Sequence, residues 1–148
     1  HVNLLHVSQH YLRNADLPLR AAVDPDALAR ACEEYAKLRG FGWSPVNYLE
    51  RAYLRHVRRY LETKQTPMRC HALRASCFID SWGNVFPCTI YDRKVGSLRD
   101  ADFDLARIWN APETAALQAE IWDYKCPQCW TPCEAYQSII GNALRPAG

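Results

Sequence analysis

Five of the cysteines between residues 70 and 133 of this 148-residue chain follow a pattern that predicts a metal site. Cys126 and Cys129 form a C-x2-C pair, which places two thiolates within reach of one metal ion or cluster. Cys70 and Cys88 flank a segment with the features of a β-hairpin, and Cys133 follows the C-x2-C pair. Four soft ligands from two distant segments would make a tetra-thiolate site, for which iron–sulfur or zinc is the natural occupant.

The predicted hairpin explains how Cys70 and Cys88 can meet. Phe78–Ile79 and Val85–Phe86 supply apolar strand residues, and the Asp80–Asn84 segment between them contains the Gly and Asn that tight turns favour. Pro87 cannot donate a ladder hydrogen bond, so strand pairing should stop there and release Cys88 towards a ligand. Since Cys70 precedes the first strand, we expect both thiols at the same end of the hairpin.

The remaining cysteines have other interpretations. Cys77 lies within or just before the first strand, where a free cysteine acts as a small buried hydrophobe. Cys32 falls on the apolar stripe of a predicted helix and is expected in the core. Cys133 is expected on the first turn of the last helix, where the helix N-terminus favours a thiolate. It remains open whether Cys133 is a ligand, a spare thiol or a thiol directed at a substrate.

The spacing favours an iron–sulfur cluster over zinc. A zinc ribbon brings two C-x2-C knuckles together, whereas here one pair is split by 17 residues and a hairpin. A zinc-stapled interaction module with four cysteine ligands and no redox role remains the alternative, and disulfides are disfavoured by the C-x2-C context. The cluster's surroundings need donors or apolar walls, and four tryptophans are near in sequence: Trp82, Trp109, Trp122 and Trp130.

Composition and charge exclude few partners. The net charge of +2 gives no pointer to nucleic acid or membrane, and no apolar run approaches the roughly 20 residues that span a bilayer. The first residues carry no signal-peptide features, and metal-binding thiols fit the cytoplasm. The chain lacks an initiating Met, so we expect it to be the C-terminal piece of a longer protein.

The pattern along the chain predicts an α+β fold in three regions. Residues 1–23 begin with a short apolar strand, and residues 24–66 contain two helices that start at Pro25 and Pro45 and form an antiparallel pair. Their apolar stripes include Leu38 and Val46. Residues 67–148 contain the hairpin, a turn over 95–100, and helices opening near Pro112 and Pro132. The prediction is a helical pair followed by a small hairpin-centred iron–sulfur domain closed by helices.

One charged feature lies outside the cysteine region. Arg51, Arg55, Arg58 and Arg59 follow one side of the second predicted helix. Such a row can contact phosphates or an acidic partner, but a solvated face balanced by Glu50 and Glu62 is the simpler interpretation.

Several of these features occur in the order found in a known family. The segments are Cys70-x12-Gly83-x4-Cys88, then Val95-Gly96-Ser97-Leu98-Arg99-Asp100, then Phe103 to Trp109, then Cys126-x2-Cys129. Together they closely resemble the C-terminal SPASM/twitch extension of radical SAM enzymes, over roughly residues 66–142.

The resemblance implies a fold, a cofactor and partners. Residues 1–23 would end a partial (β/α) barrel, 24–66 would be a helical linker, and 67–148 the auxiliary-cluster domain. Cys70, Cys88, Cys126 and Cys129 would bind one auxiliary [4Fe–4S] cluster, with Cys77 or Cys133 as possible substitutes. Since no further cysteine follows Cys133, the chain resembles a single-cluster, twitch-like domain.

The resemblance also implies an oxidoreductase-type enzyme of which this chain is a part. A second [4Fe–4S] cluster and S-adenosylmethionine would reside in the N-terminal barrel, with a peptide or small metabolite as substrate and an external electron donor. The family's catalytic C-x3-C-x2-C is absent from this sequence, where C-x2-C-x3-C has the reverse order. The chain alone is therefore expected to be inactive, with no membrane or nucleic-acid partner.

Overall fold

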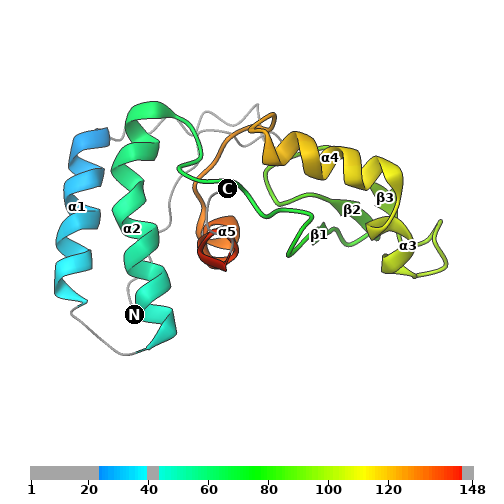
Figure 1. Ribbon diagram of the computed structural model, residues 1–148, viewed down its shortest axis with the longest axis horizontal. Coiled ribbons are helices and arrows are strands. Elements are labelled where there is room, and N and C mark those ends of the chain that lie inside the picture. Colours follow the sequence, from blue (N-terminus) through cyan, green and yellow to red (C-terminus); the bar gives the residue numbers. More distant parts are fainter. Residues whose placement is uncertain (1–23, 40–43, 145–148) are drawn as a thin grey trace.

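The computed structural model describes residues 24–39 and 44–144 of the chain. This part contains five helices and one three-stranded sheet, so the α+β class is confirmed. In chain order the elements are α1 (Pro25–Leu38), α2 (Pro45–Thr63), β1 (Phe78–Ile79), β2 (Asn84–Phe86), β3 (Gly96–Ser97), α3 (Leu105–Trp109), α4 (Pro112–Trp122) and α5 (Pro132–Leu144). The helical pair lies at one end of the molecule, the sheet with α3 and α4 at the other, and α5 between them (Figure 1).

Helices α1 and α2 start where the sequence predicts and run antiparallel side by side (Figure 1). The Asp24 side chain caps α1 by accepting a hydrogen bond from the Asp26 backbone N–H at 3.0 Å. Pro25 and Pro45 occupy first helical turns, where the missing N–H costs nothing.

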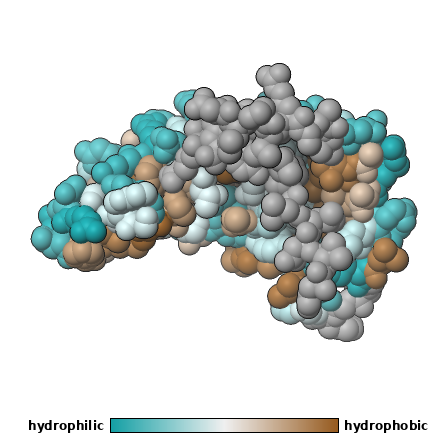
Figure 2. Space-filling view, turned by 180° about the vertical axis from the view of Figure 1, so that it is seen from behind, coloured by the Kyte–Doolittle hydropathy of each residue, from teal (hydrophilic) through white to brown (hydrophobic). Residues whose placement is uncertain are grey.

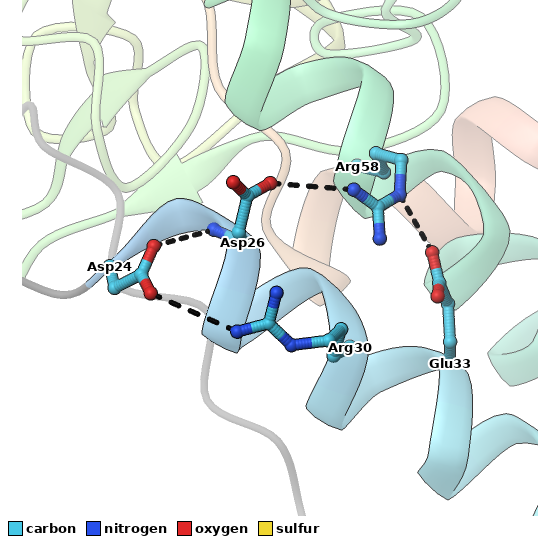
Figure 3. A network of polar contacts seen from close by, with 5 residues as sticks. All are labelled: Asp24, Asp26, Arg30, Glu33 and Arg58. Atoms are coloured by element: carbon cyan, nitrogen blue, oxygen red, sulfur yellow. Dashed lines mark hydrogen bonds and ion pairs between the residues drawn. The ribbon is translucent and has the colours of Figure 1, made fainter.

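Polar contacts also join the two helices. The Arg58 guanidinium of α2 lies 2.7 Å from Glu33 and 3.5 Å from Asp26, both on α1 (Figure 3). Near the other end of the pair, Arg39 lies 2.7 Å from the largely buried carboxylate of Glu50. These ion pairs fix the register of α1 against α2.

The sheet is antiparallel in the order β1-β2-β3. Phe78 pairs with Phe86, and Val85 pairs with both Ile79 and Gly96. The predicted hairpin is therefore confirmed. Asp80 organises its turn, because one carboxylate oxygen accepts from the backbone N–H groups of Trp82 at 3.0 Å and Asn84 at 2.8 Å. Gly83 has a φ of 85°, which residues other than glycine rarely adopt.

Three apolar clusters form the core of the described residues. The largest joins α1, α2 and α5 around Tyr53 and Trp130, whose rings stack at 5.8 Å. A second cluster centres on Leu73, Leu117 and Ile121; it includes Cys88, and Cys70 and Cys126 pack against it. The third holds Val85 of β2 against the loop after β3 and against α3. The cysteine region thus lies where the helical part and the sheet part meet.

Two sequence-based expectations about burial are wrong. Leu38 and Val46, expected on buried stripes, are 84% and 61% exposed, and they lie in the last turn of α1 and the first turn of α2. Residues 1–23, interpreted above as the end of a barrel, lie outside the described residues, so the structure shows no barrel context.

Among the described residues, no helix is both long enough and apolar enough to cross a bilayer. The described part of the rear face mixes hydrophobic and hydrophilic side chains, and hydrophilic ones cover much of its outer ends (Figure 2).

Candidate metal centre

The four cysteines singled out by sequence lie around one pocket. Cys70 comes from the segment between α2 and β1, Cys88 closely follows the hairpin, and Cys126 and Cys129 come from the loop between α4 and α5. The pocket encloses about 340 Å³ of space not filled by atoms, including its open mouth. Three segments that are distant in sequence therefore place their thiols around a common space.

The first pair is positioned by the hairpin and the loop before it. Strand pairing ends at Phe86, and Cys88 follows the buried Pro87, as expected from the missing proline N–H. The Cys70 loop closes through a hydrogen bond from Leu73 N–H to the Ser76 carbonyl at 2.7 Å. These two turns hold both thiols at the same end of the hairpin.

The second pair lies on a loop that is fastened to α2. Gln128, between the two cysteines, has a φ of 58°, so the chain turns sharply there. Thr66, just beyond α2, donates its N–H to the Gln128 side-chain oxygen and its hydroxyl to the Cys129 carbonyl, both at 3.0 Å. The Tyr60 hydroxyl reaches the Gln128 carbonyl at 3.4 Å. The C-x2-C loop is thus held by the helical pair as well as by its own turn.

Three of these sulfurs receive hydrogen-bond donors. Backbone N–H groups of Ala72 and Tyr91 donate to the sulfurs of Cys70 and Cys88 at 3.5 and 3.3 Å. The Gln128 side-chain amide lies 3.5 Å from the Cys126 sulfur. Hydrogen bonds to cysteine sulfurs stabilise thiolate ligands and tune iron–sulfur centres. The donor set therefore fits thiolate ligation.

The electrostatics of the metal-free pocket disfavour free thiolates. Burial raises the pKa of Cys70 to about 12 and that of Cys88 to about 11, and it also raises the pKa values of Cys126 and Cys129. The charges of neighbouring cysteines raise three of these pKa values further. Four thiolates in this pocket need a compensating positive charge, which a bound metal or cluster supplies.

The thiols surround the pocket without converging on one point. Within the described part of the chain, no three His, Cys, Asp or Glu side chains are arranged to hold a single metal ion. A single zinc ion bound by four thiolates holds all four sulfurs about 2.3 Å from one point, whereas each iron of a cluster takes its own thiolate.

A buried glutamate on the pocket wall was missed by sequence reasoning. Glu134, on the first turn of α5, is 7% exposed and lines the pocket beside the thiols. Burial raises the pKa of this carboxyl to about 7, and Gln137 donates a hydrogen bond to it. In the sequence, an acidic residue on a first helical turn resembles an ordinary dipole-stabilising charge. Only the packing of α5 directs it inward.

The remaining cysteines do not line the pocket. Cys77 is partly buried and packs against the second and third apolar clusters, which agrees with its interpretation as a small hydrophobe. Cys133 is exposed on α5, and Cys32 is buried between α1 and α2. All seven cysteines fall within the described residues and all are free thiols, so no disulfide links any two of them. The geometry offers four pocket thiols and no fifth.

The tryptophans do not form the pocket wall, contrary to expectation. Trp82 is 70% exposed at the hairpin turn, and Trp130 packs on α2 rather than towards the thiols. The apolar wall comes instead from smaller side chains, namely Ala72, Pro87, Ile90, Ile121 and Pro127. Proximity in sequence was a poor guide here, because Trp82 lies in the hairpin turn and the core around α2 takes up the Trp130 side chain.

The segment that carries the pocket cysteines is similar to a known family. Residues 70–133 match the SPASM family, an iron–sulfur cluster-binding domain. The matched segment begins at Cys70 and ends at Cys133, so it contains all four pocket thiols. No curated protein and no solved structure matches the chain. The match indicates that this part of the chain binds an iron–sulfur cluster.

Proposed function

We propose that Cys70, Cys88, Cys126 and Cys129 bind one [4Fe–4S] cluster, the auxiliary cluster of a radical SAM enzyme. The observation that carries this proposal is the meeting of four thiols from three segments around one pocket inside the segment that matches the SPASM family. The hydrogen bonds to the Cys70 and Cys88 sulfurs support thiolate ligation, and the family match supports an iron–sulfur cluster over a single zinc ion.

The proposed role is electron relay, substrate positioning or structural support of the enzyme. Four protein ligands leave no open iron, which favours relay or support over direct ligation of a substrate. The radical chemistry would belong to a barrel domain that holds S-adenosylmethionine and a second cluster. A peptide or small metabolite would be the substrate, an external donor would supply electrons, and a reducing compartment such as the cytoplasm suits free thiols.

The nature of the metal is tested by preparing the protein without oxygen. We expect a brown protein with a broad absorption band near ~400 nm that dithionite bleaches, together with about four iron and four sulfide per chain. A colourless protein with about one zinc per chain would refute the proposal.

Two matched variants test the ligand assignment. Cys126→Ala removes a pocket thiol and should lose most of the iron and the visible band. Cys77→Ala removes a partly buried thiol outside the pocket and should keep the iron content of the wild type. Wild-type iron content in Cys126→Ala, or iron loss in Cys77→Ala alone, would refute the ligand assignment.

A further inference from the structure

The surface of α2 carries unneutralised positive charge close to the metal centre. Arg55 and Arg59 are one helical turn apart on its solvent-facing side, with the half-buried His56 beside them. Neither arginine forms an ion pair with another described residue. Burial, and then the charges of Arg59 and Arg55, lower the pKa of His56, so both guanidinium groups lie within electrostatic reach of its ring.

The structure separates this pair from the rest of the arginine row seen in the sequence. Arg58 faces α1, where Glu33 and Asp26 neutralise it (Figure 3). Glu50, expected to balance the row, is buried and paired with Arg39. Of the two glutamates expected to balance this solvated face, Glu50 therefore does not, and only Glu62 lies beside it.

Neighbouring charges extend the positive surface. A groove between α1 and α2 lies beside Arg55, and the cationic side chains of Lys37 and Arg51 also line it. Lys37 is paired with Glu34, and Glu33 lines the same groove. The strongest unneutralised charge thus remains at Arg55 and Arg59, with Glu62 as an acidic neighbour one turn away.

This basic surface lies close to a cluster-binding cysteine. The His56 ring packs edge-on against the Trp130 ring, with centroids 5.7 Å apart. Trp130 is fully buried, donates its indole N–H to the Tyr53 carbonyl of α2 at 3.0 Å, and directly follows Cys129 in the chain. Since Cys129 lines the pocket, two packed side chains connect this surface to a proposed ligand.

We propose that the α2 surface formed by Arg55, His56 and Arg59 is the docking site for an acidic one-electron carrier protein. This inference rests on the proposed function, because it requires a redox-active cluster in the pocket. Electron tunnelling slows steeply with distance, so a carrier works best where a cluster ligand lies close to the surface. Complementary charge steers such a carrier and raises its association rate.

The proposed reaction is a simple electron transfer. One electron leaves the reduced carrier and enters the cluster held by the four cysteines. No bond forms or breaks, and no proton needs to move.

The test compares rates of cluster reduction in two charge-reversed variants. Arg55→Glu/Arg59→Glu reverses the proposed surface, whereas Arg30→Glu/Arg107→Glu makes the same net change at exposed arginines of α1 and α3. Bleaching near ~400 nm is followed by stopped flow, with reduced acidic flavodoxin as the carrier and with dithionite as a small reductant. Iron content and affinity for the oxidised flavodoxin are measured in parallel.

The expected result is selective. At low ionic strength, flavodoxin should reduce the cluster of the α2 variant at least about tenfold more slowly than that of wild type. The rate for the control variant should fall much less. In both variants, the iron content and the rate of reduction by dithionite should match those of wild type. The difference in flavodoxin rate between wild type and the α2 variant should shrink as salt is added, because salt screens the charges.

Other outcomes overturn the inference. Equal flavodoxin rates in the two variants, or a wild-type cluster that dithionite reduces and flavodoxin does not, would refute the docking site while leaving the cluster intact. Loss of RNA or anionic-vesicle binding in the α2 variant, with unchanged flavodoxin rates, would assign the surface to another partner. A wild-type protein without iron would instead refute the proposed function itself.

Discussion

Gly141 of α5 provides a sharp test of how the Cys70 loop is packed. A Cβ added at this position would lie 2.2 Å from Cε1 of the His71 ring and 2.5 Å from both ring nitrogens. His71 directly follows Cys70 and is 8% exposed. Its backbone N–H bonds the Ser138 hydroxyl at 3.1 Å, and its ring packs edge-on against Trp122 at 5.3 Å. The ring therefore has little room to retreat.

The size of the Gly141→Ala effect follows from two opposing terms. Carbon contacts settle at about 3.5–4.0 Å, so the ring would have to move by more than ~1 Å. Overpacking of this kind costs about 2–3 kcal/mol, and the better helix propensity of alanine returns about 1 kcal/mol. We expect a net destabilisation of about 1–2 kcal/mol. For a protein of this size that lowers the melting midpoint by about 2–8 °C.

The assay is anaerobic thermal unfolding of the iron-loaded protein by circular dichroism at one fixed scan rate. In a His71→Ala background the ring is absent, so Gly141→Ala should raise the melting midpoint instead of lowering it. That reversal of sign isolates the contact from any general effect on α5. Gly141→Ala with wild-type stability in the presence of His71 would show that the ring does not occupy this position.

Three further changes follow from other contacts. In the metal-free protein, burial raises the pKa values of Cys70 to about 12 and Cys88 to about 11 from an ordinary value near 9, so the unfolded chain loses these protons first. The free energy of unfolding should therefore keep its full value below about pH 9 and fall as the pH rises towards 11–12. Urea titrations at several pH values should show this fall, and it should be less steep in Cys88→Ser. Arg39→Ala leaves the buried Glu50 carboxylate without its partner and should cost about 1–3 kcal/mol in urea unfolding, with Arg39→Lys losing less; equal stability of Arg39→Ala and wild type would contradict the pairing. Asp80→Ala removes the acceptor of two turn N–H groups and should cost about 1–2 kcal/mol, whereas Asp80→Asn keeps an acceptor and should stay near wild type in the same assay.

The parts that sequence predicted well are those governed by local chemistry. Asp24 and Pro25 mark the start of α1, and Gly83 with Pro87 delimits the hairpin, because these residues have few alternative conformations. The C-x2-C spacing by itself places two thiols close together. For these reasons the sequence alone was enough to predict which cysteines surround the pocket.

The parts that sequence missed depend on packing between distant segments. Glu134 lines the pocket only because α5 turns one face towards the thiols, and no local signal records that orientation. Arg58 and Arg55 look equivalent in the sequence, yet the packing of α1 against α2 neutralises one and leaves the other exposed. Trp82 carries a large apolar side chain, but its place in a turn exposes it to solvent.

The contacts between α2 and the C-x2-C loop bear on where this protein can be divided. Tyr60 and Thr66 hold the backbone around Gln128 and Cys129, and Trp130 inserts between α2 and α5. The residues that make these contacts from the α2 side all precede the SPASM match at Cys70. A fragment cut at the match boundary would keep every pocket thiol but lose the surface that orients half of them. An expression fragment or a domain-swap chimera therefore needs to retain α2 along with the cysteines.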